Sequence, residues 1–64
     1  MDEAFNKSMR KFLRQVGVTS QQKIEEAVKE KGLSEGELHA KAVITVAELG
    51  LSHTVESVIR FEEE

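Results

Sequence analysis

Residues 11–31 read KFLRQVGVTSQQKIEEAVKEK, and the fold depends on how this stretch is interpreted. Gly17 follows a run of apolar residues at helical spacing, a place where a helix often ends on a residue in the left-handed conformation. Residues 19–22 have the composition of a capping box, in which the Thr19 hydroxyl accepts a hydrogen bond from the Gln22 backbone N–H. We therefore predict that one helix ends near residue 16, that the chain turns at Gly17, and that a second helix follows.

The two predicted helices span about residues 2–16 and 20–31. In the first, apolar residues recur at spacings of three and four and form one stripe: Phe5, Met9, Phe12, Leu13 and Val16. Its cations lie on the opposite side: Lys7, Arg10, Lys11 and Arg14. The second helix has a thinner apolar set of Ile24, Ala27 and Val28, and we expect it to end at Gly32 in a Schellman motif.

From residue 38 onward the period of the apolar residues changes to two, which is typical of strands. We predict strands over about residues 38–47 and 51–61. One face of the resulting hairpin carries Leu38, Ala40, Ala42, Ile44 and Val46 from the first strand and Leu51, His53, Val55, Ser57, Ile59 and Phe61 from the second. A two-residue loop at residues 49–50 pairs Val46 with His53. A four-residue loop at residues 48–51 preserves the same faces and remains an alternative.

The predicted architecture is therefore α+β, with a helical hairpin packed on one face of a C-terminal antiparallel β-hairpin (ααββ) in a single domain of residues 1–64. Two strands leave two unpaired edges, and an isolated hairpin is marginally stable in water. We therefore expect a homodimer, formed either by pairing of strand edges or by exchange of the hairpin between subunits. The residues expected at its interface are Val43, Val58, Leu49 and Leu51.

Many of these residues also resemble a known family. The shared positions are Phe5-Asn6, Ser8, Arg10-Lys11-Phe12-Leu13, Val16 through Gln21, Ile24-Glu25 and Ala27-Val28, and more loosely Leu49-Gly50-Leu51, His53 and Val55. In them the chain resembles a family of short bacterial proteins classed only as a domain of unknown function. The resemblance implies a bacterial, cytoplasmic setting and brings no activity, ligand or catalytic residue.

Composition excludes several classes of protein. There is no Cys among the 64 residues, so disulfides and thiolate metal sites are absent. No apolar run approaches the ~18 residues of a membrane span, and the acidic N-terminus is unlike a signal peptide, so we expect a cytoplasmic protein. The net charge of −3 is uneven. Residues 1–23 carry five basic and two acidic side chains (+3), whereas residues 24–64 carry four basic and ten acidic ones (−6).

Candidate chemistry is sparse. A helix-turn-helix reader of DNA is disfavoured because Lys23 stands where that motif needs an apolar residue, and acidic side chains at 25, 26 and 30 would face phosphates. The two histidines, His39 and His53, are expected on opposite faces of the hairpin, so no metal site is predicted. Asp2 is the single Asp, and no nucleophile motif or phosphate loop appears, so we predict neither enzyme activity nor a cofactor.

Two functions remain. The first is a non-catalytic, self-associating protein–protein interaction module, with an unidentified protein as a further possible partner. The alternative is weak binding of nucleic acid or of an anionic surface through the basic side of the first helix, at Lys7, Arg10, Lys11 and Arg14.

Overall fold

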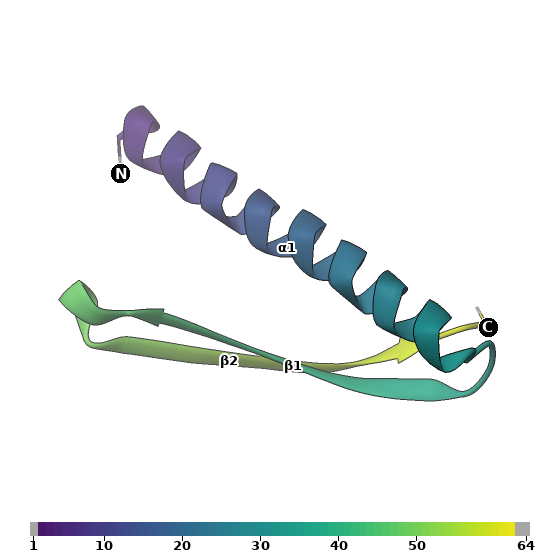
Figure 1. Cartoon of the computed structure of the whole chain (residues 1–64). Coiled ribbons are helices and arrows are strands. Elements are labelled where there is room, and N and C mark those ends of the chain that lie inside the picture. The colour runs from purple at the N-terminus through teal and green to yellow at the C-terminus, as the bar shows by residue number, and fades with distance from the viewer. Residues whose placement is uncertain (1, 63–64) are drawn as a thin grey trace. The chain divides into compact units, whose positions relative to one another are not determined.

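The structure is a computed structural model that describes residues 2–62. It is α+β, with one helix, α1 (Glu3–Lys31), followed by strand β1 (Glu37–Val46), a short 3-10 turn, η1 (Ala47–Leu49), and strand β2 (Leu51–Arg60). The two strands form an antiparallel hairpin (Figure 1). The chain forms two compact units, the helix and the hairpin, which divide after Leu33.

The prediction of two helices is wrong, because α1 is a single helix of 29 residues. Gly17 lies in its interior and does not have the positive φ expected of a turn. Thr19 does not cap a new helix; its hydroxyl donates to the carbonyl oxygen of Gln15, four residues earlier, at 2.6 Å. This bond belongs to a Ser or Thr inside a helix. A glycine costs a helix interior only about 1 kcal/mol, which the hydrogen bonds of the surrounding turns outweigh.

The apolar stripe explains why the helix continues. The positions that share one side of α1 are spaced by four, four and three residues in turn: Phe5, Met9, Leu13, Val16, Ser20, Ile24, Ala27 and Lys31. This eleven-residue repeat advances about 3.67 residues per turn and suits a nearly straight helix. The two stripes that we assigned to separate helices therefore lie in register on one helix, and a turn at Gly17 would break that alignment.

Both ends of α1 carry the caps that their residues favour. Asp2 is the N-cap, and its carboxylate accepts from the Phe5 backbone N–H at 2.8 Å. Gly32 ends the helix with a φ of 65°. Its N–H donates to the Lys29 carbonyl at 3.1 Å, and the Leu33 N–H donates to the Val28 carbonyl at 3.2 Å. This is the predicted Schellman motif, which is confirmed.

The hairpin pairs Val46 with Leu51 and continues without a bulge to Glu37 and Arg60, whose side chains form an ion pair at 3.0 Å. The predicted pairing of Val46 with His53 is therefore wrong by two residues, although the side chains assigned to each face are confirmed. The loop has four residues, Ala47–Gly50, so the alternative at residues 48–51 is placed one residue too late. Gly50 has a φ of 59° and donates to the Ala47 carbonyl at 3.0 Å. The two-residue loop would need a positive φ at Leu49 as well, which glycine tolerates far better than leucine.

No described residue between 2 and 62 is buried. Along α1 the apolar side chains of the stripe are exposed except for Val16, which is half-buried, and on the hairpin most residues are exposed and a few are half-buried. A lone helix offers one apolar stripe and a two-stranded hairpin offers two faces, so neither unit encloses an interior by itself.

Two alanine substitutions test the continuity of α1. Gly17→Ala should raise the free energy of unfolding by about 1 kcal/mol, because alanine favours a helix interior and nothing lies within 4 Å of the added Cβ. Gly32→Ala should lower it by about 1 kcal/mol, because the same methyl group meets a left-handed backbone. Thermal denaturation at one fixed protein concentration measures both. A Gly17→Ala variant that loses as much stability as Gly32→Ala would restore the two-helix interpretation.

A pair of cysteine variants tests the register, because the chain has no other Cys. Val43 and Thr54 are direct partners on the same face, so Val43→Cys with Thr54→Cys should form an intramolecular disulfide on mild oxidation. Val43→Cys with Glu56→Cys is the control, since it is matched to the register with the two-residue loop. Free-thiol titration measures the outcome. Faster loss of thiols in the control variant contradicts the observed register.

Candidate interaction surfaces

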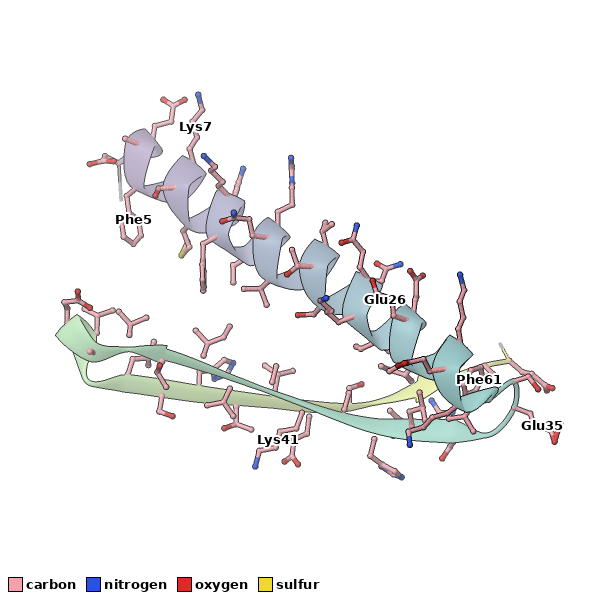
Figure 2. The ribbon with its side chains drawn as sticks, viewed as in Figure 1. Phe5, Lys7, Glu26, Glu35, Lys41 and Phe61 are labelled. Carbon is pink, nitrogen blue, oxygen red and sulfur yellow. The ribbon has the colours of Figure 1, made fainter. Side chains whose placement is uncertain are left out.

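The first surface is basic and lies on the first half of α1. Lys7, Arg10, Lys11 and Arg14 follow one another at spacings of three, one and three residues, so an uninterrupted helix brings them to one side across two turns. All four are exposed. Phe5 of the apolar stripe and Lys7 point to opposite sides of α1 (Figure 2). We call these four cations the basic surface.

The charges of the basic surface are free of ion pairs within the described residues. The ion pairs of residues 2–62 are Lys23 with Glu26, at 3.8 Å, and Arg60 with Glu37. The surface ends at Arg14, and the acidic residues of the second half of α1 begin at Glu25. The chain has no Trp or Tyr, and Phe5 and Phe12 belong to the apolar stripe on the opposite side of α1, so the basic surface offers phosphate contacts without a stacking platform for bases. The arrangement therefore suits contact with an anionic backbone or surface rather than reading of a sequence.

The four residues predicted at a dimer interface do not form one surface. We call the face of the hairpin that carries Leu38 and His53 the inner face, and the opposite face, which carries His39, the outer face. Val43 and Val58 share the outer face, but the row that pairs Lys41 with Glu56 lies between them. Leu49, at the end of η1, is 74% exposed. Leu51 lies on the inner face, opposite Val46. The structure thus distributes these residues over both faces and the tip.

Sequence reasoning missed a row of apolar residues on β2. Leu51, Val55 and Ile59 lie on the inner face and are exposed to 46%, 48% and 38%, whereas Leu38, Ile44 and Val46 of β1 are half-buried. The alternation of apolar and polar residues contained this signal. In the predicted architecture this face packs against the helices, and of the three residues the predicted interface includes only Leu51.

The histidines lie apart, as predicted. His39 pairs with Val58 on the outer face, and His53 pairs with Ile44 on the inner face. No group of three or more potential metal ligands occurs among residues 2–62. The Asp2 carboxylate, for its part, serves as the helix cap.

Comparison with known proteins agrees with the resemblance seen in the sequence. The model of a family described as "Family of unknown function (DUF6494)" matches residues 1–62. No curated protein and no solved structure matches the chain. Within residues 2–62, no helix combines the length and the apolar content of a membrane span. The family match covers nearly the whole chain, which therefore belongs to the DUF6494 family of unknown function.

Proposed function

We propose that this protein is a small, non-catalytic interaction module that works as a homodimer. One observation carries the proposal: residues 2–62 contain no buried side chain, although large apolar side chains follow α1 and occupy the hairpin. Exposed apolar surface of this extent is typical of protein–protein contacts. The bacterial, cytoplasmic setting remains a prediction that rests on the family resemblance.

The size of the chain favours a second copy as the partner. At this length a hydrophobic core rarely supplies more than about 3–5 kcal/mol of net stability. Disulfides cannot add to it, because the chain has no Cys. Two ten-residue strands leave long unpaired edges without Pro or a bulge, which natural proteins usually block or pair. Closed dimers are the commonest way in which identical chains cover such surfaces.

The non-catalytic part of the proposal rests on where the reactive side chains lie. His39 and His53 are on opposite faces of the hairpin, so they cannot act on one substrate as an acid and base pair. The Asp2 carboxylate is bound to a backbone N–H at the start of α1. A general acid or base must lie within hydrogen-bond reach of the proton that it transfers, and groups on opposite faces of the hairpin cannot both reach one reacting atom.

Sedimentation equilibrium tests the homodimer. Across micromolar concentrations we expect a species of twice the 7.2 kDa chain mass, and we expect thermal unfolding to shift to higher temperature as concentration rises. The control is circular dichroism of the same samples, which verifies that they are folded. A 7.2 kDa species that unfolds cooperatively at the lowest concentration contradicts the proposal.

The basic surface favours a second candidate function, which is binding of an anionic polymer or surface. Its four cations are exposed and lie on one side of α1, and none forms an ion pair within the described residues. Such contacts are salt-dependent and independent of sequence. For a duplex, four phosphate contacts would lose roughly a hundred-fold in affinity between about 50 and 200 mM salt.

A gel shift with duplex DNA or RNA tests this candidate. If the basic surface binds, replacing Lys7, Arg10, Lys11 and Arg14 together by alanine should abolish the complex seen at low salt. The matched control replaces Lys23, Lys29, Lys31 and Lys41 by alanine, which removes the same charge from elsewhere in the chain. Absence of any complex at low salt, or equal loss in both variants, eliminates the basic surface as the binding site.

A further inference from the structure

The free edge of β2 can be defined group by group. The Phe61 N–H donates to the Gly36 carbonyl at 3.4 Å, which extends the β1–β2 register by one pair. Because hydrogen-bonded and non-hydrogen-bonded pairs alternate in an antiparallel ladder, the odd-numbered residues of β2 are bonded to β1. The N–H and C=O groups of the even-numbered residues point away from β1: Ser52, Thr54, Glu56, Val58 and Arg60.

The sequence of β2 is complementary to itself when two copies run antiparallel with Val55 at the two-fold axis. On the inner face Leu51 then lies opposite Ile59 of the second copy, and His53 lies opposite Ser57. On the outer face Thr54 lies opposite Glu56. Leu51 and Val55 thus meet apolar partners, and the pairs His53–Ser57 and Thr54–Glu56 each offer a hydrogen-bond donor and acceptor, whereas Ser52 lies opposite the apolar Val58. Cross-strand pairs of this kind contribute to sheet stability.

Two neighbouring registers keep the same faces, with the axis at Thr54 or at Glu56. The axis at Thr54 sets Leu51 opposite Ser57 and Val55 opposite His53, so it loses the apolar pairs. Moving the two-fold axis to Glu56 sets two Glu56 carboxylates directly opposite each other, and like charges in direct cross-strand pairs are destabilising. With the axis at Val55 no like charges are direct partners. The paired segment still covers residues 51–59, which is nearly the whole strand.

The edge of β1 is less suited to the same pairing. An axis at Ala42 sets Lys41 opposite Val43 of the second copy, so the cation gains no acceptor. The residues at the centre of β1 on the inner face are Ala40 and Ala42, which would bring little apolar surface to the line of contact between two copies, here called the seam. The large apolar side chains that are exposed on the inner face belong to β2, at Leu51, Val55 and Ile59.

We propose that a second copy of this chain pairs with the β2 edge, antiparallel about Val55, so that the two hairpins form one sheet in the order β1-β2-β2-β1. The inference rests on the proposed homodimer and names the surface that forms it. Hydrogen bonds join Thr54 to Glu56 and Ser52 to Val58 of the other copy. At Val55, a non-hydrogen-bonded position, the two Cα atoms come within about 4.5 Å of each other.

Single cysteines at two matched positions test this pairing. Val55 and Ala42 are direct partners within one hairpin and share its inner face, and each lies on the two-fold axis of one candidate seam. Because the chain has no Cys, any disulfide in these variants joins two chains. Under mild oxidation at micromolar concentration we expect Val55→Cys to become a covalent dimer and Ala42→Cys to remain reduced. Non-reducing electrophoresis measures the fraction crosslinked.

Any crosslinking result other than a covalent dimer of Val55→Cys alone overturns the inference. Preferential crosslinking of Ala42→Cys assigns the seam to β1, and equal crosslinking of both variants contradicts a closed dimer. If neither crosslinks while sedimentation shows a dimer, the β2 seam is wrong and the proposed self-association stands. If sedimentation shows a monomer, both the β2 seam and the proposed homodimer are wrong.

Hydrogen exchange on the unsubstituted chain gives an independent measurement, which does not depend on how the cysteine variants fold. The amides of Ser52, Thr54, Glu56 and Val58 should exchange slowly in the dimer, and dilution to monomer should speed them. The amides of His39, Lys41, Val43 and Thr45, which point to the free edge of β1, are the internal control and should exchange fast throughout. Fast exchange at the β2 edge in the dimer contradicts the seam.

Discussion

Burial of apolar side chains needs at least two layers of secondary structure, and neither α1 nor the hairpin is more than one layer. This constraint governs the molecule. The backbone hydrogen bonds of each unit close locally, along α1 and across β1 and β2, and the ends of α1 are capped. The apolar side chains cannot be buried within one unit, because the stripe of α1 and a face of the hairpin each need a second layer packed against them. The element that packs on these apolar surfaces therefore determines which surfaces stay free for contacts with other molecules.

The length of α1 depends on two opposing features of the sequence, the residues that favour a break and the apolar stripe that favours one continuous helix. The break-favouring residues alone predict the wrong result. Gly17 and Thr19 each favour a break, one by its left-handed freedom and the other by its capping hydroxyl. Against them stands a stripe that stays in register from Phe5 to Ala27. Thr19 shows how the outcome is reached, since its hydroxyl bonds back to Gln15 inside the helix. A capping residue is therefore evidence of a helix start only where the apolar period also breaks.

The features that could be predicted are those in which one residue type has one good conformation. Gly32 ends the helix because its left-handed backbone allows both Schellman bonds, and the faces of the hairpin follow from a strict period of two. The loop could not be predicted in the same way, because loops of two and four residues preserve the same faces. Only the backbone of Leu49, which avoids a positive φ, separates them. The exposure of Leu51, Val55 and Ile59 could not be predicted either, since an exposed row and an internal row have the same alternation of apolar and polar residues.

The proposed self-association and the proposed anion binding would use different parts of the chain, so the two could operate together. The basic surface belongs to α1, whereas the β2 edge belongs to the hairpin, so neither uses a residue of the other. A dimer would carry two basic surfaces on one particle. Four cations on one convex helix bind an anionic polymer weakly, but linking two such sites makes the second contact intramolecular and raises the overall affinity without any new contact. Dimerisation through the hairpin would therefore strengthen an interaction in which the hairpin itself takes no part.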